Sequence, residues 1–79
     1  MNKTTNTLDL RGVACPMNFV RAKLFLEQME PGALLEVIID QGDPLRHVPA
    51  SLRTEGHEIL AARPLESGFQ LLVRRGAGA

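Results

Sequence analysis

The stretch LDLRGVACP, residues 8–16, contains a complete transition from a strand to a helix. Its two leucines alternate with charged residues, which predicts a strand with one buried face. Gly12 permits a turn, and Pro16 suits the first position of a helix. We therefore expect Cys15, the single cysteine of the chain, to stand at the N-cap of that helix.

An N-cap position would give Cys15 a particular chemistry. The first N–H groups of a helix have no partners within the helix, and with the positive end of the helix dipole they favour an anion. A thiol held there ionises more readily than a free thiol. The alternative is a buried cysteine that acts as a small hydrophobic residue. A junction between a loop and a helix usually faces solvent, so its position favours the reactive interpretation.

Hydrophobic spacing and turn residues predict the remaining elements. Strands are expected at about 7–11, 34–40, 57–62 and 69–75, and helices at about 16–30 and 44–55, with a turn at 66–68 and a frayed tail at 76–79. The order is βαβαββ, and right-handed crossovers place both helices on one face of the sheet. The predicted fold is an α/β two-layer sandwich with a mixed four-stranded sheet.

The second helix has residues typical of helix ends at both of its boundaries, but it also contains an internal proline. Asp43 is expected at its N-cap and Pro44 at its first helical position. Gly56 is expected to end it. Pro49 removes an internal hydrogen bond, which predicts an irregular first turn or a regular helix that begins only there. Its inner stripe is Leu45, Val48 and Leu52.

The first helix has two apolar stripes. The stripe expected to face the core is Phe19, Ala22, Leu26 and Met29. The stripe expected to face away from the core is Met17, Val20 and Leu24. Three apolar residues in a line that begins beside the cysteine favour a docking patch for a partner protein. Ordinary scattered surface residues are the alternative. Arg21 and Lys23 border the patch and could pair with acidic residues of a partner, and Arg46 is a further candidate for partner binding. If the stripe is ordinary surface, partner recognition is expected elsewhere, at Arg46 or Arg74.

Composition limits the classes of function. The 79 residues make one domain with nine basic and nine acidic side chains, three Phe and no Trp or Tyr. A neutral chain with few aromatic residues is poorly suited to bind nucleic acid. One cysteine excludes an internal disulfide and fits a reducing compartment. The polar residues 1–7 and the short apolar runs predict neither a signal peptide nor a membrane span, so we expect a cytoplasmic protein.

The histidines offer little support for a metal site. Neither His47 nor His57 stands at a ligand spacing from Cys15, and we expect both at the surface or at a strand end. A nucleophilic pair of the cysteine with one of them stays open, because proximity in the fold need not follow the sequence.

The sequence resembles the TusA-like (SirA-like) family of small sulfur carriers. The resemblance rests on LDLRG at 8–12, CP at 15–16, PG at 31–32, RHVP at 46–49 and GHE at 56–58, and it covers about residues 7–75 of the single domain. It implies the βαβαββ sandwich and a role as a sulfurtransferase that needs no cofactor. Cys15 would take sulfur from a cysteine desulfurase or a rhodanese-like donor as a persulfide and pass it to an acceptor protein.

The chain departs from the family pattern at one position. The family usually has Cys-Pro-x-Pro, whereas here Asn18 replaces the second proline. Asn18 restores a backbone N–H and adds an amide that could approach a thiolate or a capping group. With Gly12 and Pro16, it would support the start of the helix.

A second class of function is a binding or regulatory module in which Cys15 is incidental or a redox sensor. Such a module would recruit its partner through the outward stripe of the first helix. Selective alkylation separates the two, because a carrier needs an exposed thiol that reacts quickly near neutral pH.

Overall fold

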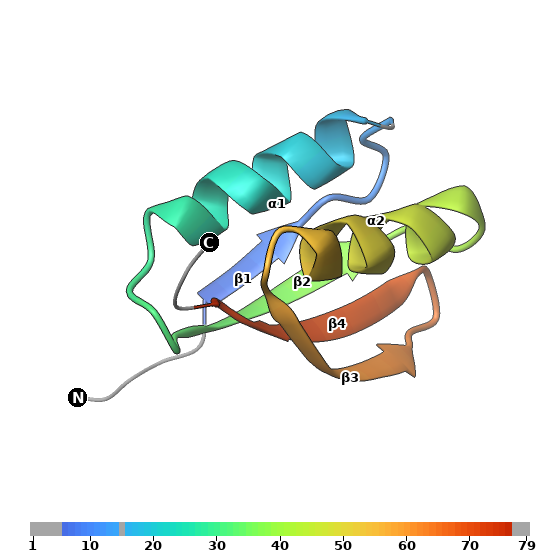
Figure 1. Cartoon of the computed structure of the whole chain (residues 1–79). Coiled ribbons are helices and arrows are strands. Elements are labelled where there is room, and N and C mark those ends of the chain that lie inside the picture. Colours follow the sequence, from blue (N-terminus) through green and yellow to red (C-terminus); the bar gives the residue numbers. More distant parts are fainter. Residues whose placement is uncertain (1–5, 15, 77–79) are drawn as a thin grey trace.

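Six elements follow one another in the order βαβαββ in the computed structural model, which describes residues 6–14 and 16–76 (Figure 1). The elements are β1 (Asn6–Asp9), α1 (Met17–Glu27), β2 (Leu34–Ile39), α2 (Asp43–Thr54), β3 (Glu58–Pro64) and β4 (Phe69–Arg74). The predicted order and the predicted type of each element are confirmed.

The four strands form one mixed sheet in the order β1-β2-β4-β3. β1 runs parallel to β2, whereas β4 is antiparallel to both β2 and β3. Both helices cover the same face of this sheet (Figure 1). The expected two-layer α/β sandwich is therefore confirmed.

The core lies between the helices and that face of the sheet. Alternate residues of β2 are fully buried, and β4 contributes two more buried side chains. The buried apolar residues are Leu10, Ala22, Leu26, Leu35, Val37, Ile39, Val48, Leu52, Leu71 and Val73. Phe19, Met29 and Leu45 are partly buried and pack against this group. Both predicted inner stripes thus face the core.

The bounds of α1 differ from the prediction at both ends. Pro16 stands at the N-cap and not at the first helical position, with φ −90° and ψ 8°. The helix ends at Glu27, because the N–H of Met29 donates to the carbonyl of Leu26, three residues back, at 3.0 Å. Such bonds tighten the last turn, and Pro31 could not continue the helix.

The start of α2 also corrects the prediction. Gly42 is the N-cap, with φ 92°, and Asp43 is already the first helical residue. Glycine adopts this left-handed conformation without steric cost, so the chain turns at Gly42 and not at the residue after it. Asp43 forms an ion pair with Arg46 one turn on.

Pro49 lies inside a continuous α2 that begins at Asp43, so neither the expected irregular first turn nor the expected helix start at Pro49 is observed. A proline in this position removes one backbone hydrogen bond, a cost of about 3 kcal/mol. Its ring is buried beside Val48 and Leu52, and this burial offsets part of the cost.

The strand ends shift by one or two residues. β1 stops at Asp9 because the carboxylate of Asp9 accepts the N–H of Arg11 at 3.0 Å and turns the chain. β3 extends to Pro64 and contains a bulge between Ile59 and Ala61. Gly76, expected to fray, donates its N–H to the Nδ1 of His57 at 3.1 Å. Residues 77–79 lie outside the described residues.

Candidate functional site

Both helices begin at the same edge of the sheet. Because β1 and β2 are parallel neighbours, their carboxyl ends meet at one edge, and α1 and α2 start there (Figure 1). The positive ends of two helix dipoles therefore lie at this edge. The first turn of α1 has no acidic residue to offset its positive end.

Cys15, the predicted nucleophile, lies outside the described residues. Because Pro16 is the N-cap of α1, the prediction that Cys15 is the N-cap residue is wrong, and Cys15 comes one position before the N-cap in the sequence. The two residues that flank it in the sequence, Ala14 and Pro16, are both exposed. The carbonyl of Ala14 accepts the N–H of Asn18 at 3.1 Å, and the carbonyl of Pro16 accepts the N–H of Val20 at 3.0 Å. The chain on both sides of Cys15 is thus joined to the first turn of α1.

The loop before the cysteine begins with a tight turn. The N–H of Val13 donates to the carbonyl of Leu10 at 3.1 Å, and Gly12 has φ 82°. A positive φ at the third residue is typical of a type II turn and favours glycine there. The predicted turn at Gly12 is confirmed.

A charged network surrounds this turn. The guanidinium of Arg11 holds both carboxylate oxygens of Asp9, at 3.0 and 2.7 Å, and donates to the carbonyl of Ser67 at 3.1 Å. The hydrogen bond from the Arg11 side chain lowers the pKa of Asp9 from 3.8 to about 2. The N–H of Gly12 donates to Oδ2 of Asp40 at 2.8 Å. The network joins the loop to the β3–β4 turn and to the segment after β2.

Asn18 lies on the buried side of α1, with only 1% of its surface exposed. Its N–H donates to Ala14, as expected for a residue that restores the amide a proline lacks. Its Oδ1 accepts the N–H of Phe19 at 2.6 Å. Asn18 therefore forms hydrogen bonds with residues around the start of α1 on the buried side of that helix.

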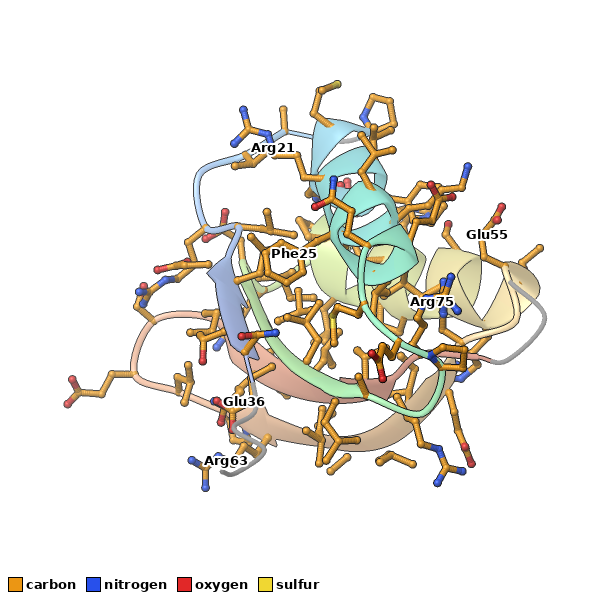
Figure 2. All side chains as sticks on the ribbon, turned by 90° about the vertical axis from the view of Figure 1, so that its left-hand side faces the viewer. Arg21, Phe25, Glu36, Glu55, Arg63 and Arg75 are labelled. Carbon is orange, nitrogen blue, oxygen red and sulfur yellow. The ribbon has the colours of Figure 1, made fainter. Side chains whose placement is uncertain are left out.

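The opposite side of α1 is apolar and open to solvent. Met17 is 49% exposed and Leu24 is 52% exposed, while Val20 between them is half-buried. Arg21 is exposed and points outward, whereas Phe25 points toward the sheet (Figure 2). The outward stripe therefore faces solvent as the spacing predicted, with Val20 its most buried member. We define Met17, Val20 and Leu24 as the α1 patch.

The flanking basic residues differ in their surroundings. Nζ of Lys23 lies 3.7 Å from a carboxylate oxygen of Glu27, one turn on in α1. Arg46 is exposed in the first turns of α2 and pairs with Asp43. Arg74 pairs with Glu58 across β4 and β3. Arg46 thus lies at the sheet edge where both helices begin, and Arg74 lies at the opposite edge, next to Leu34 at the start of β2.

The two histidines lie at different places in the fold and differ in burial. His47 is exposed in α2, as expected. His57 directly precedes β3, so it lies at a strand end as expected, at the end of the sheet opposite the start of α1 (Figure 1). It is buried, so the alternative of a surface position does not hold. Burial, and then the charge of Arg75, lower the pKa of His57. Its Nδ1 accepts the N–H of Gly76, so His57 holds the C-terminal end of the sheet rather than the cysteine loop.

Two site features were not anticipated from the sequence. One is the contact of Asp40 with the turn at Gly12, and the other is the burial of Asn18. A polar residue four positions before Ala22 and eight before Leu26 lies on the same side of a helix as both, and this spacing could have indicated the burial of Asn18. The bond between Asp40 and Gly12 joins residues 28 positions apart and has no local signal.

Within residues 6–14 and 16–76, no group of three or more His, Cys, Asp or Glu residues is placed to hold a metal ion. In the same part of the chain, neither helix has the length and apolar character needed to cross a membrane.

Comparison with known proteins assigns the chain to a family. The family model "Sulfurtransferase TusA" matches residues 6–75, and the chain belongs to this family. A protein of Archaeoglobus fulgidus is 39% identical over 74 residues, which cover 92% of this chain and 84% of the relative. A protein of Neisseria meningitidis is 36% identical over 70 residues, which cover 89% of this chain and 95% of the relative. Both relatives bear the description "Putative sulfur carrier protein".

Two solved structures share the fold. A SirA-like protein from Desulfitobacterium hafniense aligns with a TM-score of 0.76 at 22% identity, over 91% of this chain and 99% of the other. A protein from Helicobacter pylori aligns with a TM-score of 0.74 at 22% identity, over 92% of this chain and 100% of the other. At this level of identity, the two structures support the fold of the chain.

Proposed function

We propose that this protein is a cytoplasmic sulfur carrier that holds sulfur as a persulfide on Cys15. The observation that carries this proposal is the match of residues 6–75 to the sulfurtransferase TusA family, together with relatives described as sulfur carriers. The single cysteine of the chain falls in the motif of that family. A chain with one thiol suits a reducing compartment, which supports the cytoplasm as its location.

The chemistry of the proposed carrier is thiol–persulfide exchange. The Cys15 thiolate attacks the terminal sulfur of a persulfide on the donor protein, such as a cysteine desulfurase or a rhodanese-like protein. A new S–S bond forms on Cys15 as the donor's S–S bond breaks, and the donor leaves as a thiolate. A thiolate of the acceptor protein then repeats the exchange and regenerates the Cys15 thiolate. The net reaction consumes no external oxidant or reductant.

The surroundings of Cys15 suit this exchange. Thiolate and persulfide are both anions, and the positive end of α1, whose first turn has no acidic residue, lies at this end of the sheet. Exposed neighbours on both sides leave room for the active site of another protein to approach. Gly12, Pro16 and Asn18 support the turn and the first helical turn that flank the thiol.

The α1 patch is the proposed docking surface for donor and acceptor proteins. It begins at Met17, two positions after Cys15, and continues along the solvent side of α1 to Leu24. Arg21 and Lys23 on this helix, and Arg46 on α2, would contact acidic residues of a partner. A docked partner would then reach the sulfur at the end of the patch.

The rate of alkylation of Cys15 as a function of pH separates a carrier from a binding module. We expect a midpoint clearly below the free-thiol value of about 8.5, because the helix start favours the thiolate. The measurement is the rate of reaction with iodoacetamide from pH 5 to pH 10 in the folded protein, and the unfolded protein serves as the reference. A midpoint equal to or above that of the unfolded protein would contradict the proposal and favour the module.

A further inference from the structure

The loop that leads to Cys15 is bonded at four consecutive amides. Each N–H group of residues 10–13 donates a hydrogen bond. Two of them go to backbone carbonyls, of Ile38 at 2.7 Å and of Leu10 at 3.1 Å. The other two go to carboxylates, of Asp9 at 3.0 Å and of Asp40 at 2.8 Å. The backbone of this loop is therefore fixed up to the second residue before the cysteine.

The two carboxylates hold the loop in different ways. Asp9 belongs to the strand that enters the loop, so its bond to the N–H of Arg11 closes a local turn. Asp40 follows β2 and lies 28 positions from Gly12 in the sequence. Its bond ties the turn to the segment that leads into α2. A hydrogen bond from an amide to a carboxylate is stronger than one between neutral groups.

Gly12 is the residue of the loop whose backbone gains most from a hydrogen bond that fixes it. Its φ of 82° is accessible to glycine, but glycine also has the largest conformational freedom to lose. Its N–H faces the segment after β2 and not another part of the turn. Without an acceptor at position 40, the turn would keep its local bonds from Val13 to Leu10 and from Arg11 to Asp9, but it would lose the bond that ties it to the segment after β2.

We propose that Asp40 is a positioning residue for Cys15: by accepting the N–H of Gly12, it holds the loop so that the thiol stays at the start of α1. This inference rests on the proposed function, since it concerns the thiol that would carry the sulfur. Asp40 acts through the backbone of the loop and takes no part in the exchange itself. Its hydrogen-bond acceptor is needed for this role, whereas its negative charge is not.

Two variants of Asp40 separate the hydrogen bond from the charge. Asp40→Asn removes the charge and keeps an acceptor oxygen, whereas Asp40→Ala removes both. Each folded variant is measured for the pH midpoint of Cys15 alkylation, for its melting temperature and for amide hydrogen exchange at Gly12. Asp43→Asn and Asp43→Ala form the matched pair, because Asp43 is an exposed carboxylate at the same edge that pairs with Arg46.

We expect the alkylation midpoint of Asp40→Ala to lie about one pH unit above that of Asp40→Asn, because a thiol released from the helix start returns toward the free-thiol value. The two Asp43 variants should share one midpoint. Exchange at the Gly12 amide should accelerate at least about tenfold in Asp40→Ala, and the Arg11 amide, bonded to Asp9, should keep its rate in all variants. The melting temperature should stay close to that of the wild type.

Equal midpoints for Asp40→Ala and Asp40→Asn would overturn the inference, because Asp40 would then act through its charge or not at all. If Asp40→Ala does not fold, amide hydrogen exchange at Gly12 in the wild type and in Asp40→Asn tests the inference instead. Protection of the Gly12 amide in both the wild type and Asp40→Asn supports the inference, and exchange at the rate of an unstructured peptide overturns it. None of these measurements uses a sulfur donor, so a failure of the proposed function would be seen separately in the loading of sulfur.

Discussion

The double substitution Met17→Asp with Leu24→Asp should slow sulfur transfer from a protein donor by about thirtyfold or more while leaving the fold intact. Met17 and Leu24 are each about half exposed, so neither contributes a buried side chain to the core. Exposed substitutions usually change stability by no more than about 0.5 kcal/mol. Anchors at an interface can contribute more than about 2 kcal/mol of binding, which corresponds to this fold-change.

A matched control for this double variant is Leu60→Asp. Leu60 is 42% exposed and lies on β3, the edge strand furthest from β1. The measurements are the initial rate of sulfur transfer from a cysteine desulfurase, the same rate with a small-molecule persulfide, and the melting temperature. Only the protein-donor rate of the α1 variant should fall. Equal losses in Leu60→Asp, or normal transfer in the α1 variant, would contradict docking at the α1 patch.

Gly68→Ala should lower the free energy of unfolding by about 3 kcal/mol or more, because backbone strain and a steric clash combine at this position. Gly68 has φ 101°, which an L side chain rarely adopts. A Cβ there would overlap the carbonyl oxygen of Ile39 and lie 3.3 Å from Cδ of Arg11. The β3–β4 turn would then have to move away from the charged network at the cysteine end of the molecule.

The control for this prediction is Gly32→Ala. Gly32 has φ 85°, but no atom lies within 4 Å of the position its Cβ would occupy. Gly32→Ala should therefore lower the free energy of unfolding by about 1–2 kcal/mol, from backbone strain alone. Chemical denaturation of the wild type and both variants gives the comparison. Similar losses in the two variants would mean that the contact with Ile39 contributes nothing.

The sequence predicted those parts of the fold that depend on neighbouring residues. Apolar spacing indicated the inner stripes of both helices, and the Gly12 turn followed from glycine at the end of a strand pattern. The order of elements and the right-handed crossovers then placed both helices on one face. The outward direction of Met17 and Leu24 followed from the same helical spacing.

The errors arise where distant residues meet. His57 is buried, and its Nδ1 accepts the N–H of Gly76, 19 positions later, a bond that nothing near His57 in the sequence indicates. The hydrogen bond between Asp40 and Gly12 likewise joins residues that are far apart in the sequence. Pro49 lies inside α2 with its ring buried, so burial in the fold offsets part of a penalty that local sequence alone would predict. Local patterns therefore predicted the elements, but not the bonds that hold the candidate site.

The most direct test of the carrier function is the intact mass of the protein after incubation with a cysteine desulfurase and cysteine, followed by removal of the donor. The wild type should gain the mass of one sulfur atom, and a reductant that cleaves persulfides should remove it. Cys15→Ser should gain nothing, because it lacks the thiolate that attacks the donor persulfide. A wild type that gains no sulfur from any competent donor, or a Cys15→Ser variant that gains as much as the wild type, would contradict the account.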